Sequence, residues 1–195
     1  TITTTGGAKD GTGTSAGAGG TITFSDNVSL EDDTSDSSGV VLTTGSTAGN
    51  IAFSGTVNGA TTLSLTSGTG SLTLGGILGG GTGLKGLTIS GPSITLSNDI
   101  TIDGNFEVSA PVSLGADITI DTDHAGTDGN ITFNSTINGT QSLTLKSGSG
   151  AITIDGAIGA DQILTGLSIN ATDGDTGTIE ITDIGDADAE GVNTG

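Results

Sequence analysis

The hydrophobic residues of this chain alternate with small or polar residues in short triplets. Most triplets place two apolar side chains on one face and a Thr or Ser on the other, which is the pattern of a half-buried β-strand. Apolar residues at helical spacing are scarce, and Gly, Thr and Ser, which are poor helix formers, fill the gaps. The pattern therefore predicts an all-β chain. Representative triplets are 22–24, 51–53, 63–65, 72–74, 87–89, 94–96 and 179–181.

The spacing of the triplets indicates how the strands are arranged. Between residues 94 and 120 a new strand is expected every six residues. Strands this short do not pair stably as hairpins. A chain that bends after each short strand and repeats this pattern is typical of a solenoid, in which each strand stacks in parallel on its counterpart in the next coil. We expect a parallel β-helix with three short strands per coil of about 18–21 residues.

One 41-residue segment occurs twice, at residues 50–90 and 130–170. The two copies agree at 18 positions without a gap, mainly at aliphatic and glycine positions. Such agreement is typical of a repeat whose interior and turns are constrained. Residues 1–195 are therefore predicted to form one continuous β-helix segment of a longer chain, with the 80-residue unit corresponding to about four coils.

The Asn-Gly pairs at 58–59 and 138–139 support a different arrangement. Asn-Gly is the strongest short signal for a type I′ hairpin turn. A sandwich or propeller built from hairpins is therefore the alternative fold.

Composition narrows the classes of partner. The chain has 22 acidic residues against three lysines and no arginine, for a formal net charge of -19. Such a charge repels nucleic acid and anionic lipid, so neither is an expected partner. Leu, Ile, Val and Phe make up about 24 % of the residues, above the ~20 % below which a highly charged chain tends to be disordered. There is no cysteine and hence no disulfide, and no run of ~18 apolar residues that would insert into a membrane.

Three phrases carry a resemblance to a known class of protein: GADITIDT (115–122), GNITF (129–133) and SLTLKSGSGAITIDGAIG (142–159). They resemble the repetitive regions of large bacterial surface proteins, the filamentous-haemagglutinin-like and autotransporter-like adhesins. The resemblance covers most of residues 20–185. It implies a right-handed parallel β-helix, export across the cell envelope, and a role as a stalk or adhesive rod. The secretion domains of those families are not part of this sequence.

The expected function is accordingly that of a non-enzymatic rod or stalk segment in an exported bacterial cell-surface or extracellular-matrix protein. The expected partners are neighbouring coils or copies of the same protein, with surface glycans or other cells as further candidates. The alternative is a filament or sheath subunit that polymerises by end-to-end stacking of coils. Outward rows of small hydroxyl residues also resemble flat ice-binding solenoids, but Ser, Asp and Glu107 interrupt the Thr residues, so no long uniform Thr array forms.

A repeated DITID motif is the sharpest candidate for chemistry. Asp99, Asp103, Asp117 and Asp121 occupy two identical motifs, which lie one coil apart on the predicted spacing. Asp99 is then expected over Asp117, and Asp103 over Asp121, roughly 4.8 Å apart. Stacked carboxylates recruit a hard cation, so these four residues are candidate calcium ligands. The alternative is that they point outward at the strand ends and remain hydrated.

The same stacking suggests an enzyme as a third function. Retaining glycosidases use two carboxyl groups about 5 Å apart. Such sites also hold sugars with aromatic or cationic groups, and this chain has no Trp, Tyr or Arg. An enzyme that acts on polysaccharides is therefore the least favoured hypothesis.

Two other motifs have structural explanations, and two Asp-rich pairs are weaker candidates for calcium. Residues 81–86 (GTGLKG) match the dinucleotide fingerprint G-x-G-x-x-G, but no helical pattern follows, so a turn is expected. His124 is the only histidine and is expected to be a solvated loop residue. The Asp-rich pairs at 173–175 and 186–188 complete neither an EF-hand nor a calcium-binding nonapeptide repeat.

Overall fold

The computed structural model describes residues 20–31, 39–46, 48–124, 126, 128–170 and 177–185. In these residues the chain forms eighteen β-strands and no helix. Every pairing between the strands is parallel. The protein is a parallel β-solenoid, as the triplet pattern predicted, and the hairpin-built alternative is wrong.

Three rows of strands form the three faces of the solenoid. The first face contains β1 (Ile22–Phe24), β4 (Ile51–Phe53), β7 (Leu72–Leu74), β9 (Ile94–Leu96), β11 (Val112–Leu114) and β14 (Ile137–Asn138). The second contains β2 (Val28–Ser29), β5 (Val57–Asn58), β12 (Ile118–Asp121), β15 (Ser142–Lys146) and β17 (Gly166–Ile169). The third contains β3 (Val40–Thr43), β6 (Thr62–Thr66), β8 (Leu84–Ser90) and β13 (Ile131–Phe133).

Three further strands run around a corner from one face to the next. They are β10 (Ile100–Val108), from the second face to the third, and β16 (Ile152–Ile158) and β18 (Ile179–Ile184), from the third face to the first. One strand on each face completes a coil, so the prediction of three strands per coil is confirmed.

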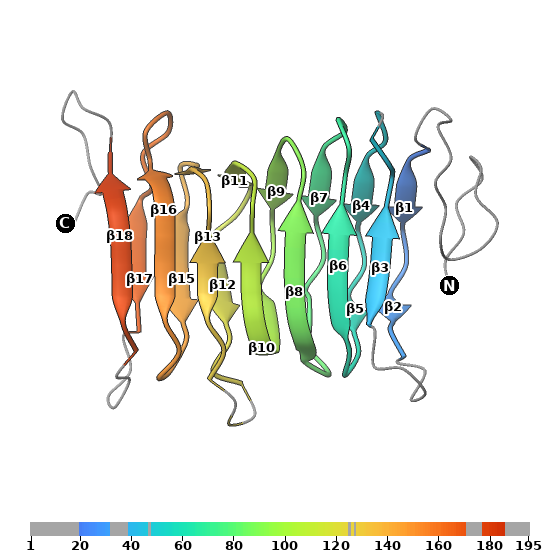
Figure 1. Ribbon diagram of the computed structural model, residues 1–195, viewed down its shortest axis with the longest axis horizontal. Helices are drawn as coiled ribbons and strands as arrows, with labels where there is room; N and C mark the ends of the chain where they lie inside the picture. The colour runs from blue at the N-terminus through green and yellow to red at the C-terminus, as the bar shows by residue number, and fades with distance from the viewer. Residues whose placement is uncertain are drawn as a thin grey trace.

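The path of the chain gives the coil its hand. In Figure 1 the third face is toward the viewer and its strands point up, whereas β15 and β17 lie behind and point down. The chain advances from the N-terminal coil at the right to the C-terminal coil at the left. A chain that rises in front, returns behind and advances in this direction forms a right-handed coil, the usual hand for parallel crossovers.

The coils differ in length more than the triplet spacing suggested. Ile94 pairs with Val112, which matches the lower end of the predicted coil length, whereas Ile22 pairs with Ile51, which lies well beyond the upper end. The predicted length therefore applies only to the shortest coils. Insertions at the corners lengthen the others without changing which strands pair, because a surface loop can grow while the rows stay aligned.

The 80-residue repeat is not a whole number of coils. Ile51 lies on the first face, between Ile22 and Leu72. Its counterpart Ile131 lies on the third face, between Phe106 and Ile152. From Ile51 to Ile131 the chain passes through eleven strand positions, which is three and two-thirds turns instead of the predicted four. The second copy is therefore rotated by one face about the axis of the solenoid.

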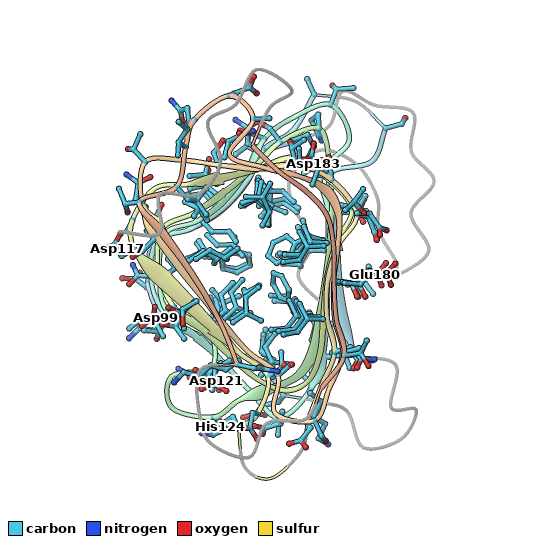
Figure 2. The ribbon with its side chains drawn as sticks, turned by 90° about the vertical axis from the view of Figure 1, so that its left-hand side faces the viewer. Asp99, Asp117, Asp121, His124, Glu180 and Asp183 are labelled. Carbon is cyan, nitrogen blue, oxygen red and sulfur yellow. The ribbon has the colours of Figure 1, made fainter. Side chains whose placement is uncertain are left out.

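The interior is aliphatic, with two pairs of phenylalanine rings in contact. Figure 2 looks along the solenoid and shows the side chains of successive coils lying over one another inside the three faces. The rings of Phe24 and Phe53 stack with centroids 4.7 Å apart, and those of Phe106 and Phe133 are 5.4 Å apart and tilted. Because neighbouring coils are fixed one strand spacing apart, apolar side chains of successive coils pack on one another, and Phe106 is paired with Leu87 on one side and Ile131 on the other. The buried polar residues in the described part of the chain are Thr44, Thr61, Ser67, Thr122 and Ser147.

Asparagine side chains hold the corners by accepting hydrogen bonds from the next coil. The Asn58 Oδ1 accepts from the Gly81 amide at 2.8 Å, and Asn138, its counterpart in the repeat, accepts from the Asp161 amide at 2.9 Å. The pair formed by Asn50 and Asn130 acts in the same way on the amides of the coils that follow them. These bonds satisfy backbone donors that the turns leave unpaired.

Glycine follows Asn58 and Asn138 because the corner leaves no room for a side chain. Gly59 and Gly139 have φ values of 150° and 148°. A Cβ on Gly59 would lie 2.2 Å from the carbonyl oxygen of Leu30 in the preceding coil. The Asn-Gly pairs are thus corners of a parallel solenoid and not type I′ hairpin turns.

We expect Phe106→Ala to destabilise the solenoid by about 3–5 kcal/mol, because it removes a fully buried ring and leaves a cavity. Thr132→Ala, a truncation at the outward position of the next strand, should change the free energy of unfolding by less than about 0.5 kcal/mol. Urea denaturation followed by circular dichroism measures both values. Equal losses in the two variants would contradict an interior that is packed this closely.

Candidate functional site

The register separates the carboxylates that the repeated DITID motif was expected to stack. Ile100 pairs with Ile120 and Thr101 pairs with Asp121, so Ile100 does not lie against Ile118, its counterpart in the second motif. The predicted stacking of Asp99 over Asp117 and of Asp103 over Asp121 is therefore wrong.

The physical reason lies in the connection between the first and second faces. Leu96 and Leu114 are paired on the first face, and Ile100 and Ile120 are paired on the second. The chain takes four residues from one face to the other in the earlier coil and six in the later coil. The two added residues shift the second motif along its row.

Asp99 and Asp117 fix turns in the same way as the corner asparagines. The Asp99 Oδ1 accepts a hydrogen bond from the Thr119 amide at 2.8 Å, and the Asp117 Oδ1 accepts one from the Ser142 amide at 2.8 Å. Both carboxylates lie on the outer side of the solenoid (Figure 2). The hydrogen bonds from the backbone and side chain of Ser142 lower the pKa of Asp117, because they favour its charged form.

Asp103 and Asp121 lie near the corner where the chain passes from the second face to the third. Asp103 Oδ1 is 2.7 Å from His124 Nδ1, and Asp121 Oδ2 is 3.9 Å from Lys146 Nζ. Asp121 Oδ1 also accepts a hydrogen bond from the Asp123 amide at 3.0 Å. His124, at the bottom of Figure 2, has a side chain that is 48 % exposed. It is a loop residue, as predicted, but it is paired with a carboxylate of the preceding coil, which the sequence did not indicate.

The same loop is held to the following coil by Asp128. The Asp128 carboxylate accepts hydrogen bonds from the hydroxyl and the amide of Ser149. These bonds, together with a smaller contribution from Asp123, lower the pKa of Asp128. The Ser149 hydroxyl therefore contacts Asp128 and not the His124 ring, so these side chains do not form the nucleophile–base–acid order of a hydrolase triad.

The calcium hypothesis was based on stacked carboxylates, and the structure does not contain that stacking. Each of the four candidate aspartates has a hydrogen-bond or ion-pair partner within the protein. Within the described ranges, no group of three or more His, Cys, Asp or Glu residues is placed to hold a metal ion. Calcium binding by Asp99, Asp103, Asp117 and Asp121 stays a prediction. The Asp-rich pairs at 173–175 and 186–188 lie outside the described residues.

The glycine-rich stretch 81–86 is a turn followed by a strand. The amides of Gly81 and Thr82 donate to the Asn58 side-chain oxygen, and β8 begins at Leu84. A dinucleotide site requires a helix at this position to bind the pyrophosphate. The prediction of a structural turn is confirmed.

A hollow on the third face was not indicated by the sequence. Its volume is about 350 Å³. Gly86 lies between Thr62 and Asn105 in an outward-facing row and contributes no side chain, so the surface is open there. Gly86 can be read from the sequence, but only the strand register shows that Thr62 and Asn105 are its neighbours. The lining residues are Thr62, Leu63, Ser64, Lys85, Gly86, Leu87, Thr88 and Asn105.

Comparisons with protein-family models, with curated proteins and with solved structures find no match to this chain. In the part of the chain that the structure describes, no helix is long and apolar enough to cross a membrane. The class of the protein is therefore defined by its fold, that of a parallel β-solenoid with three strands per coil.

We expect Asp117→Asn to reduce the loss of solenoid stability that occurs when the pH is lowered. The folded-state pKa of Asp117 is lowered, so its stabilising contribution is present above the pKa of the unfolded chain, near 3.8, and is lost as the pH falls through the lower folded-state value. Asparagine keeps an oxygen for the Ser142 amide but does not titrate. Urea unfolding at pH 7 and pH 3 should show a smaller loss of stability in this variant than in the natural chain.

The matched control is Glu180→Gln, which removes one negative charge from an exposed strand position on the third face. It should leave more of the acid dependence in place than Asp117→Asn does. If the two variants lose the same amount of stability between pH 7 and pH 3, general charge repulsion and not the bond to Ser142 sets the dependence.

Proposed function

We propose that this chain is a non-enzymatic rod or stalk segment of an exported bacterial cell-surface or extracellular-matrix protein. The observation that carries the proposal is the parallel pairing of three rows of strands around an aliphatic interior, with isolated bridges at Leu78 joining β5 to β10 in the second row. In such a structure each coil contacts mainly its neighbours, so the fold extends in one dimension and forms a rod of any length. The repeated Gly-, Thr-, Ile- and Leu-rich sequence, which resembles the repetitive regions of bacterial adhesins, supports the same role.

The positions of the polar side chains also favour a structural role. The carboxylates of Asp99, Asp117 and Asp128 accept backbone hydrogen bonds at the corners. A catalytic site instead requires acids, bases and charge-stabilising donors that converge on one concave site. In the described residues these groups are spread along the outside of successive coils and stabilise turns.

A second function is favoured by the C-terminal coil, namely assembly by end-to-end stacking. In the described part of the chain, β17 and β18 each pair along one edge only. Ile179 and Ile184 continue the rows of Ile152 and Ile158 but are 48 % and 43 % exposed. A free strand edge beside exposed aliphatic side chains accepts a further strand. That strand comes from a flanking coil of the same chain in a stalk, and from another copy in a filament.

We expect the native polypeptide that contains this sequence to be a surface-retained chain several times longer than 195 residues. An antibody against the purified segment, used on denaturing gels of fractionated cells, measures both its size and its location. The long chain follows from the rod proposal, because a solenoid rod lengthens by adding coils to the same chain.

Two other results discriminate among the functions. A short chain in large assemblies that detergent dissolves would replace the stalk by a polymerising filament. A short soluble monomer inside the cell would contradict both functions.

A further inference from the structure

We propose that the hollow over Gly86 on the third face binds a sugar unit that carries a carboxylate group. We call this site the Gly86 hollow. The inference rests on the adhesive form of the proposed function and gives that function a ligand class. It is carried by three features: the shape of the surface, a lysine that forms no ion pair among the described residues, and a set of neutral hydrogen-bonding groups.

The shape follows from one missing side chain in a regular array. Thr62, Gly86 and Asn105 are neighbours on three adjacent strands. Gly86 does not have a positive φ, and a Cβ built on it would lie 3.5 Å from its nearest neighbours, which is ordinary van der Waals contact. The backbone therefore does not require glycine here. The resulting hollow of about 350 Å³ is open to solvent and has room for one sugar ring.

Lys85 supplies a positive charge at this hollow. The chain has three lysines against 22 acidic residues. Lys146 lies 3.9 Å from Asp121, whereas Lys85 forms no ion pair with a carboxylate among the residues that the structure describes. An ammonium group without a partner in so acidic a protein forms a charge-assisted hydrogen bond with a carboxylate on a ligand.

Neutral polar groups around Lys85 match the hydroxyl groups of a sugar. Thr62, Ser64 and Thr88 bring hydroxyl groups to the rim of the hollow. The Asn105 Oδ1 accepts a hydrogen bond from the Asn130 amide at 2.9 Å, so the side chain is fixed and its NH₂ group remains as a donor. Hydroxyl groups both donate and accept, as sugar hydroxyls do.

The net charge of the chain limits how many carboxylates the ligand carries. A total of -19 repels a polyanion, and at physiological salt this repulsion acts over about 8 Å. Glu107 is paired with Thr88 on the neighbouring strand and adds a negative charge nearby, so the single carboxylate of the ligand must lie against Lys85. The ligand that fits is therefore an otherwise neutral glycan with an occasional uronic-acid type of sugar, and not a densely charged polysaccharide.

The experiment is a titration of the full 195-residue chain with an oligosaccharide that contains a single glucuronate, followed by NMR. We expect saturable binding with a dissociation constant on the order of 1 mM, as for a single weak site, and shifts at Lys85, Gly86 and Asn105. Gly86→Thr should weaken binding at least about tenfold by filling the hollow. Lys85→Gln should weaken it severalfold and remove most of its dependence on salt.

Matched controls exist on another face of the solenoid. Gly166 is the counterpart of Gly86 in the repeat but lies on the second face, and a Cβ there would be 3.6 Å from the nearest atom, on Ser142. Gly166→Thr and Lys146→Gln make the same chemical changes away from the hollow. Both should bind like the natural chain, and urea unfolding should show that all four variants are folded.

Several results would overturn the inference. They are no saturable binding of the glucuronate oligosaccharide, equal weakening by the Gly166 and Gly86 variants, or equal binding of a neutral oligosaccharide that Lys85→Gln does not change. Each of these outcomes leaves the rod proposal intact if the native chain is long and retained at the surface. A short intracellular chain would instead remove the proposed function on which the hollow depends.

Discussion

Parallel backbone pairing between coils is the constraint on which the rest of this structure depends. Each strand must lie about 4.8 Å from its counterpart in the next coil, with its amides and carbonyls in register. The inward side chains are then stacked in rows, and apolar residues that pack on the apolar residues of the next coil fill the interior. This explains the ladders of Ile and Leu and the two phenylalanine pairs. It also explains why charged residues stay at the corners and on the outer surface.

The corners are stabilised by polar side chains because pairing between strands cannot continue there. A turn leaves backbone amides without partners, and a short side chain from the preceding coil supplies the acceptor. Asn58 and Asn138 do this in the two copies of the repeat, and Asp99 and Asp117 do the same with a carboxylate. Two of the aspartates that the sequence offers as candidate site residues thus stabilise turns. The acidic composition of the chain therefore does not by itself indicate a metal site.

Because the second copy of the repeat is rotated by one face, residues that are equivalent in sequence lie on different surfaces of the solenoid. Gly86 and Gly166 are the same position of the repeat, yet one lies on the third face beside Asn105 and the other on the second face beside Ser142. Equivalent residues of the two copies therefore meet different neighbours. The two copies of the repeat share the residues of the apolar interior and the tight corners. Their outward residues differ in surroundings from one face to another.

The sequence alone determined the fold class, because the alternation of apolar and polar residues and the glycine-rich corners are local signals of short strands that turn repeatedly. Ile94 to Ile100 shows the pattern without reference to any other part of the chain. The register between coils was decided only by the tertiary structure, because it depends on how many residues each corner takes up. Two additional residues before Ile120 separated the predicted aspartate pairs. The register of other coils placed Asp103 beside His124 and Gly86 between Thr62 and Asn105. Local patterns specify strands, but contacts between coils depend on summed loop lengths, which no local pattern encodes.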